Sequence, residues 1–187
     1  MDDTLKLKNL HTAIKQKFKG KNLVFGHGPL DAKIVFVSEM VGSDEDREQK
    51  PMAGANAKLL NQILKKAGID KRKIYITNVV KYSTPSGNIQ PSPKEVKSHA
   101  TFLKEELKTI NPKIVVTFGN LALNGVGMRQ PIENVHGRTF NLGSYELLPT
   151  FHPQMALNNP QIKSLLEADF IKLKTLLNNK EGSDENT

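Results

Sequence analysis

The hydrophobic positions of the chain fall into short continuous runs and longer amphipathic ones. Four short runs are apolar without polar alternation and three of them are rich in Val and Ile: Lys33–Ser38, Ile74–Val80, Lys113–Phe118 and Glu146–Phe151. Runs of this kind are typical of strands buried on both faces of a parallel sheet. Pro149 marks the end of the fourth strand or an edge position, because proline cannot donate to a sheet. The pattern predicts a central, mainly parallel four-stranded sheet.

Amphipathic segments with helix-terminating residues separate these runs. The first twenty residues are rich in lysine and have helical spacing. Further helices are expected at Gly54–Ala67, which ends before Gly68, and at Pro93–Ile110, which ends before Asn111-Pro112. Another should begin at Leu121 with Asn120 as its cap, and the last should span Gln161–Leu177. Alternating strands and helices indicate a single-domain α/β fold, a three-layer α/β/α sandwich over residues 1–178. The polar, acidic residues 179–187 are expected to form a disordered tail.

Polar side chains stand where three of these strands end. Glu39 follows the first strand, Asn78 lies near the end of the second, and His152 follows the fourth. In open parallel sheets the ligand site lies beyond the carboxyl ends of the strands. We therefore expect these three residues to converge at one edge of the sheet.

Composition narrows the class of protein. The 187 residues carry a formal net charge of +8 and an isoelectric point near 9.6, a balance that favours a polyanionic partner. There is no cysteine, which excludes disulfides, thiol nucleophiles and iron–sulfur clusters. No apolar run is long enough for a membrane span, and no signal peptide precedes the first strand, so we expect a cytoplasmic monomer without a membrane partner.

Four motifs carry a family resemblance. They are "VFGHGPLDAKIVFVSEMVGSDED", "KPMAGANAKLLNQIL", "YITNVVKYSTPSGNIQPSP" and "FHPQMALNNP". In this order and spacing they resemble the family 4 uracil-DNA glycosylases, from about His11 to the final helix. The resemblance implies a monofunctional DNA glycosylase of base excision repair, which flips uracil (deaminated cytosine) out of DNA and hydrolyses its N-glycosidic bond.

The resemblance also implies roles for single residues. Asn78 would read the uracil edge, and His152 would donate a hydrogen bond to O2. Glu39, with Glu45 as a second candidate, would position or deprotonate the attacking water or offset the charge of the sugar cation. Further residues follow from the motifs: Met52 and Met40 at the base, Leu157 with Met155 as the wedge that replaces the flipped base, and Lys81 and Asn120 on the DNA. Lys94 and the stretch Lys71-Arg72-Lys73 are additional candidates for phosphate contacts.

The chain departs from the family pattern at several positions. The four family cysteines are replaced by His11, Ile14, Tyr82 and His99, so no cofactor or metal is expected, and Tyr82 is predicted to fill part of the vacated volume. Met52 stands where the family has a phenylalanine that stacks on uracil. Ser38, Met40-Val41 and Asn158 replace a glycine, an Ala-Pro pair and an arginine.

Other functions stay open at the level of the sequence. The altered pocket residues could suit another modified or damaged base. A glycosylase fold could also hold DNA or a flipped base without turnover. A nucleotide-binding enzyme of the doubly wound class is disfavoured, because no Gly-rich phosphate loop follows the first strand.

Overall fold

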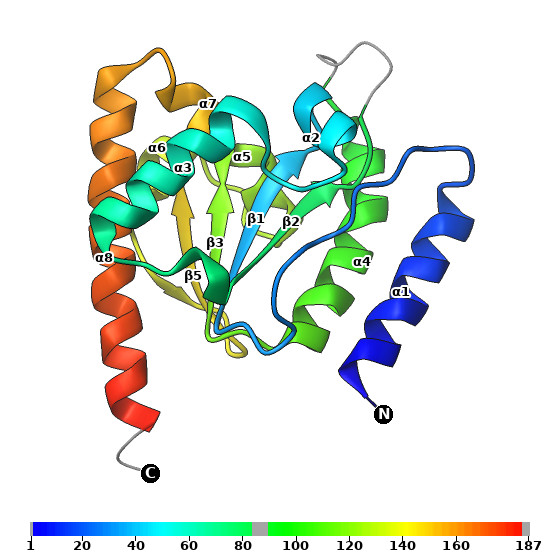
Figure 1. Ribbon diagram of the computed structural model, residues 1–187, viewed down its shortest axis with the longest axis horizontal. Helices are drawn as coiled ribbons and strands as arrows, with labels where there is room; N and C mark the ends of the chain where they lie inside the picture. The colour runs from blue at the N-terminus through cyan, green and yellow to red at the C-terminus, as the bar shows by residue number, and fades with distance from the viewer. Residues whose placement is uncertain (1, 84–89, 185–187) are drawn as a thin grey trace.

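A computed structural model describes residues 2–83 and 90–184 of the chain. Its centre is a five-stranded sheet of order β2-β1-β3-β5-β4 (Figure 1). Four strands are parallel and confirm the predicted ones: β1 (Ile34–Met40), β2 (Ile74–Val80), β3 (Ile114–Phe118) and β5 (Glu146–Thr150). The sequence pattern missed β4 (Phe140–Asn141), which pairs antiparallel with β5, because two residues are too few to show a period. Part of the loop that follows Tyr82, at residues 84–89, lies outside the described residues.

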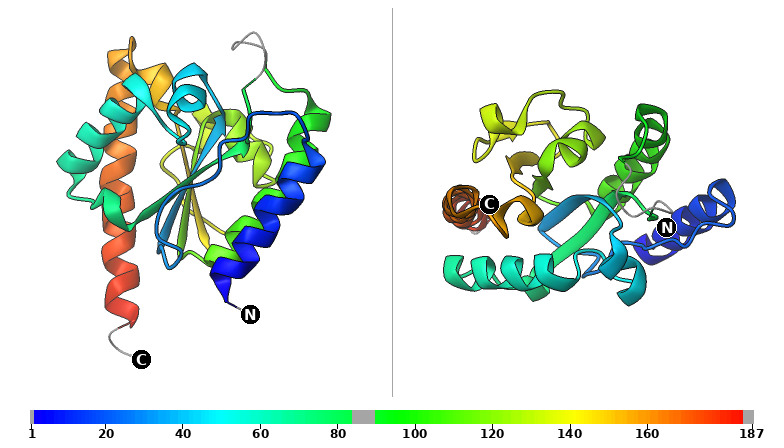
Figure 2. Two further views of the ribbon diagram at one scale, coloured as in Figure 1. Left: turned by 45° about the vertical axis from the view of Figure 1, so that its right-hand side comes forward. Right: turned by 90° about the horizontal axis from the view of Figure 1, so that it is seen from above.

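Alternate residues of each strand supply two separate apolar cores. Ile34 and Phe36 of β1 face the cluster of α3 and α8, whereas Val35 and Val37 face the cluster of α4, α5 and α6. The sheet is therefore covered on both faces, as Figure 2 shows from above. This arrangement confirms the three-layer sandwich and explains why the strands carry no polar alternation.

Two predicted helices, Gly54–Ala67 and Pro93–Ile110, have the expected bounds, and four short helices among the described residues were not predicted. The described helices are α1 (Asp3–Lys17), α2 (Ser43–Glu48), α3 (Gly54–Ala67), η1 (Lys71–Lys73), α4 (Pro93–Ile110), α5 (Gly119–Gly125), α6 (Ile132–Val135), α7 (Pro153–Ala156) and α8 (Pro160–Asp184). Helix α1 packs on the outside of α4 (Figures 1 and 2). In the part of the chain that the structure describes, no helix has both the length and the apolarity to cross a membrane.

Two helix boundaries differ from the expectation. Helix α5 starts at Gly119 with Phe118 as N-cap, so Asn120 lies inside the first turn and does not cap it. Helix α8 continues to Asp184, so the predicted disordered tail is wrong for residues 179–184, while residues 185–187 lie outside the described residues. The polar composition of residues 179–184 gave no sign of a helix. These residues continue helix α8, whose earlier part packs on the sheet through Leu166, Phe170 and Leu173.

The segment after α1 covers the free edge of β2. Leu23 and His27 form isolated antiparallel bridges to Tyr82 and Ile76. The Val24 amide donates to the Lys81 carbonyl at 2.8 Å, and the His27 amide donates to the Ile76 carbonyl at 2.8 Å. These bonds satisfy an edge that would otherwise be open to another chain.

The four positions that hold cysteine in the resembled family are filled by packed side chains. The His99 ring stacks on Phe18 with centroids 4.0 Å apart, and Tyr82 lies against both rings. Ile14 is fully buried, and His11 stacks on Phe25 with centroids 4.1 Å apart. These residues do not fit an iron–sulfur cluster, since they offer no thiolate, and within the described residues no three His, Asp or Glu groups come together as metal ligands. As predicted, Tyr82 fills the space, and its hydroxyl donates to Glu95 Oε1 at 3.0 Å.

His99 is buried in this aromatic cluster, and neither ring nitrogen has a hydrogen-bond partner among the described residues. Burial, helped by the positive charge of Lys81, lowers the pKa of His99 from 6.5 to about 4. In the folded protein the His99 ring therefore stays neutral until the pH approaches 4. Below pH 6.5 the unfolded chain takes up a proton that the folded chain does not, so the free energy of unfolding falls as the pH drops towards 4.

We predict that His99→Phe removes part of this acid sensitivity. One pKa unit corresponds to about 1.4 kcal/mol, so the variant should lose up to about 3 kcal/mol less stability between pH 6.5 and 4 than the parent. Urea unfolding at several pH values measures this difference. His27→Gln, which replaces an exposed histidine, is the matched control. Identical pH profiles for the parent and His99→Phe would contradict the prediction.

Candidate active site

At the carboxyl edge of the sheet, the side chain of Asn78 on β2 lies beside that of Ser38 on β1. Asn78 is 1% exposed and is the register partner of Ser38 on β1. Both residues share the face of Ile34, Phe36 and Ile76, the face covered by α3 and α8. The Asn78 Nδ2 atom is buried and has no hydrogen-bond partner within the described residues. A buried donor without an acceptor costs about 1–3 kcal/mol, which makes this amide a candidate for binding a ligand.

His152 follows β5 and reaches Ser38 across the sheet edge. Its Nδ1 accepts a hydrogen bond from the Gln154 amide at 3.0 Å, and its Nε2 lies 2.9 Å from Ser38 Oγ. Burial lowers the pKa of His152 to about 4, so the imidazole is neutral at pH 7. Because Nδ1 accepts, the ring proton resides on Nε2 and points to the Ser38 and Asn78 side of the site.

A buried carboxylate fixes the strand that carries His152. Asp169 of α8 is fully buried and accepts from the Thr150 hydroxyl at 2.7 Å. The His136 Nδ1 atom lies 3.0 Å from the same carboxylate oxygen. These contacts join β5, α6 and α8 two residues before His152, so the loop leaves the sheet in a defined direction.

Glu39 lies at the end of β1 against the start of α5. The Leu121 amide donates to its Oε1 at 3.1 Å. Burial raises the pKa of Glu39, and the Leu121 bond opposes this shift in part. Gly119 has φ of +85°, and a β-carbon there would collide with the Glu39 carboxylate, so this close approach requires glycine. A carboxylate with a raised pKa is a stronger base for water.

Glu45, the second candidate for activating water, has a different role in the structure. Its Oε2 accepts from the Gly42 amide at 3.1 Å and its Oε1 from the Ala53 amide at 2.9 Å. It is 7% exposed. Since both oxygens already hold backbone amides, Glu45 joins the loop after β1 to the loop before α3, and Glu39 remains the candidate base.

The two methionines predicted at the base lie on different sides of the sheet. Met52 is 6% exposed, has φ of +57°, and belongs to the apolar cluster on the α3 face, which also contains Phe36 and Phe118. Met40 packs against the cluster on the α4 face. Met52 therefore shares a face with Asn78, and Met40 does not.

The predicted DNA-contacting residues have unequal exposure. Met155 in α7 is 40% exposed, whereas Leu157 just after it is half-buried against the core. Asn120 is exposed, and its Oδ1 accepts from the Ile132 amide at 2.8 Å. Lys94 is exposed at the start of α4. Lys71–Lys73 precede β2 and so lie at the amino edge of the sheet, about 16 Å of strand before Asn78.

The prediction that Lys81 contacts DNA phosphates is wrong. Lys81 is 1% exposed, and its Nζ donates to Glu106 Oε2 at 2.8 Å, to Thr77 Oγ1 at 2.7 Å and to the Asn78 carbonyl at 3.0 Å. The Tyr75 hydroxyl also donates to Glu106, at 2.9 Å. A buried cation is stable only when paired and hydrogen-bonded, and Glu106 supplies that pairing.

Sequence reasoning missed Glu106, Ser38 and Asp169 as residues that build the site. For Glu106 a signal existed, because this carboxylate lies on the apolar face of α4 with Leu103, Leu107 and Ile110. Asp169 similarly precedes Phe170 on the buried side of α8. For Ser38 the signal was its place at the glycine of the family motif, although a serine at a strand end does not by itself indicate a role in the site.

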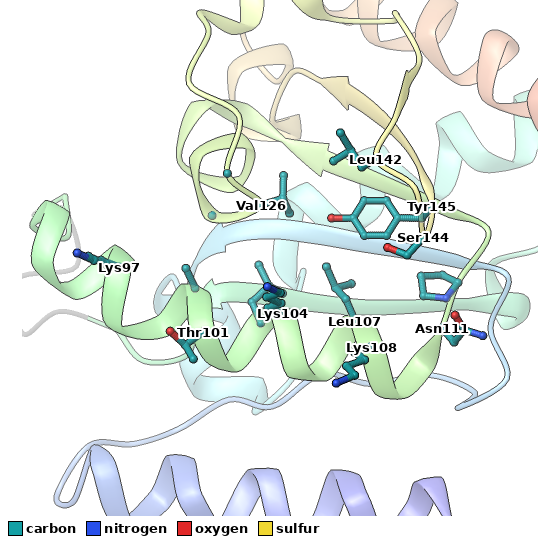
Figure 3. Close-up of a pocket in the computed structure, with 15 residues that line it drawn as sticks. Lys97, Thr101, Lys104, Leu107, Lys108, Asn111, Val126, Leu142, Ser144 and Tyr145 are labelled. Atoms are coloured by element: carbon teal, nitrogen blue, oxygen red, sulfur yellow. The ribbon is translucent and has the colours of Figure 1, made fainter.

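A separate cavity of about 830 Å³ lies on the flank of the sheet. Figure 3 shows Leu107 and Lys104 of α4 on one side and Tyr145 and Leu142 on the other. Neither Glu39, Asn78 nor His152 lines it. This cavity is therefore separate from the candidate site at the carboxyl edge of the sheet.

Comparison with known proteins supplies the family. The family model described as "Uracil DNA glycosylase superfamily" matches residues 25–173. The chain is 35% identical to a Type-4 uracil-DNA glycosylase of Thermotoga maritima, over 91% of each chain. It is 36% identical to one of Saccharolobus solfataricus, over 88% of this chain and 80% of that protein. It is also 32% identical to a DNA polymerase of Bacillus phage SP01, over 83% of this chain and 17% of the polymerase.

We predict that Lys81→Met destabilises the fold by about 3–5 kcal/mol, because it leaves the Glu106 carboxylate buried and unpaired. The double variant Lys81→Met/Glu106→Leu should recover much of this loss. Urea unfolding of the two variants and the parent measures both effects. Lys94→Met, at an exposed lysine, is the control. A stable Lys81→Met protein would contradict the buried pair.

Proposed function

This chain belongs to the uracil-DNA glycosylase superfamily, whose members hydrolyse N-glycosidic bonds in DNA, and we propose that it excises uracil that arises from deaminated cytosine, as the first step of base excision repair. The substrate is uracil in single- or double-stranded DNA, and the enzyme acts as a monomer without a cofactor. The family match and the positions of Asn78, His152 and Glu39 at one sheet edge support this proposal.

The observation that carries the proposal is the unpartnered amide of Asn78. Its Nδ2 is buried and finds no acceptor in the part of the chain that the structure describes. Uracil offers O4 as an acceptor and N3–H as a donor, which match the NH₂ and the carbonyl of one asparagine. Cytosine offers the reverse pattern, a donor at N4 and an acceptor at N3. Mismatched buried groups can reject a substrate by several orders of magnitude, so Asn78 discriminates between the two bases.

The remaining groups fit the charges that develop as the bond breaks. Flipping the nucleotide out of the stack costs a few kcal/mol, least for a mispaired base. The sugar then becomes cation-like and the base leaves as an anion. The neutral His152 holds its Nε2 proton on the side of the site where O2 gains negative charge. Glu39 directs and deprotonates the water that attacks the sugar.

The reaction ends at an abasic site without strand cleavage. A glycosylase that also cleaves the strand needs an amine as nucleophile. Lys81, which follows Asn78 by three residues, is held by Glu106, Thr77 and the Asn78 carbonyl. It is therefore not free to attack the sugar.

A second candidate substrate is another modified or damaged base. Met52 at the family's phenylalanine position favours it, since a methionine is a more adaptable wall than an aromatic ring. The replacement of phenylalanine by Met52 changes only the side chain that would pack on the face of the base. It does not change the role proposed for Asn78.

We predict excision of uracil from a labelled oligonucleotide, read as alkali-labile strand breaks, with uracil single-stranded or opposite G or A. Asn78→Ala should lower the rate about 10²-fold or more. Asn78→Asp should weaken discrimination and admit cytosine. Asn124→Ala, on an asparagine of α5, serves as the control variant. Absence of excision by a folded wild-type protein, followed by failure on a panel of modified bases, would leave DNA binding as the function.

We also predict that Met155→Ala and Leu157→Ala lower excision from duplex DNA more than from single strands. These side chains would fill the gap that a flipped base leaves in a duplex, and a single strand has no such gap. Rates on matched single- and double-stranded substrates measure the ratio. Leu165→Ala, at an exposed leucine of α8, provides the comparison. Equal losses on the two substrates would assign these residues to packing.

A further inference from the structure

We propose that Ser38 is a catalytic residue, whose hydroxyl donates a hydrogen bond to O2 of the flipped uracil, and that His152 acts through Ser38 as a positioning residue. This inference rests on the proposed function and concerns how the leaving base is stabilised. It differs from the simpler reading in which His152 donates to O2 directly.

The direction of the His152–Ser38 hydrogen bond follows from the neighbouring backbone. The Gln154 amide can only donate, so His152 Nδ1 must accept at the 3.0 Å separation. A neutral imidazole then carries its proton on Nε2, which lies 2.9 Å from Ser38 Oγ. Nε2 therefore donates and the serine oxygen accepts. The lowered pKa of His152 agrees with this protonation state.

The serine hydroxyl keeps its own proton for another acceptor. Ser38 is 3% exposed, and no second hydrogen bond of its Oγ is found among the described residues. Ser38 and Asn78 are register partners on adjacent parallel strands, which are about 4.8 Å apart. Two buried donors, the Ser38 hydroxyl and Asn78 Nδ2, thus stand side by side. Uracil presents two carbonyl oxygens, O2 and O4, on either side of N3, which suits this pair.

The resulting chain of hydrogen bonds runs from His152 Nε2–H to Ser38 Oγ–H to O2. Each donor in such a chain strengthens the next one. When the bond between the base and the sugar breaks, its electron pair stays with the base and negative charge reaches O2. Water forms the new bond to the sugar carbon and passes its proton to Glu39. The base anion then takes up a proton from solvent. The Ser38 hydroxyl thus donates a hydrogen bond to O2, the atom on which negative charge develops.

The opposite possibility is that Ser38 obstructs the site. The resembled family has glycine at this position, so a serine could simply occupy the acceptor space that O2 needs. The two possibilities predict opposite effects of removing the hydroxyl, which makes them separable.

The test is a double-mutant cycle of wild type, Ser38→Ala, His152→Ala and the double variant, with single-turnover rates on a single-uracil oligonucleotide. We expect each single substitution to lower the rate about 10²- to 10³-fold with little change in KM. The double variant should be hardly slower than the worse single variant, because the two groups act as one unit. Ser38→Thr should restore most of the rate. A Ser38→Ala or Ser38→Gly enzyme as fast as wild type or faster, or fully additive losses, would overturn the proposal.

Imidazole nitrogen NMR of the free protein separates this inference from the proposed function. At pH 7 we expect the His152 proton on Nε2, with a signal that changes in Ser38→Ala. A proton on Nδ1, or a signal indifferent to Ser38→Ala, overturns the inference even if the wild type excises uracil. A wild type that does not excise uracil refutes the proposed function and the catalytic role of Ser38 with it. Excision by the wild type with an unaffected Ser38→Ala variant refutes the inference alone.

Discussion

The buried ion pair between Lys81 and Glu106 is the interaction on which the site depends. Removing both charges from water is costly, and only good geometry with additional hydrogen bonds offsets that cost. Here Thr77, Tyr75 and the Asn78 carbonyl supply those bonds. The network joins the end of β2 to α4 and fixes the backbone of Asn78. A side chain that reads a base by two hydrogen bonds needs a backbone held to that degree, because small displacements weaken directional bonds.

Beside this network, aromatic packing fills the place where the resembled family has cysteines. The stack of His99 on Phe18, with Tyr82 against both, connects α1, α4 and the end of β2 through apolar contact. A metal cluster joins the same kind of segments by covalent coordination. Within residues 2–83 and 90–184 neither ring nitrogen of His99 has a hydrogen-bond partner, so acid destabilises this aromatic packing.

The site combines neutral donors with one carboxylate of raised pKa. Asn78, Ser38 and the neutral His152 supply hydrogen bonds without a full positive charge, and Glu39 lies on the far side of β1 against α5. Donors that are already oriented need no reorganisation when charge appears on the base. Glu45 stabilises the loop after β1 and the loop before α3 by accepting hydrogen bonds from their backbone amides. The chemistry therefore depends on a framework of buried hydrogen bonds as much as on the groups that face the base.

The sequence by itself determined the layered α/β fold, the four long strands and the sheet edge at which Glu39, Asn78 and His152 follow their strands, because these follow from local periodicity and from the geometry of parallel strands. It could not show that Glu39 lies against α5, whereas Asn78 and Ser38, the contact of His152, share the opposite face. It also identified the family by its motifs. It could not reveal that Lys81 is buried, that Glu45 holds two loops, or that Met40 and Met52 lie on opposite faces. Only the tertiary structure decided these matters, since each depends on contacts between residues far apart in the chain. Ser38 and His152 meet across 114 positions. A hydrogen bond of that kind leaves no periodic trace, because its partners belong to elements that fold together only when the sheet forms.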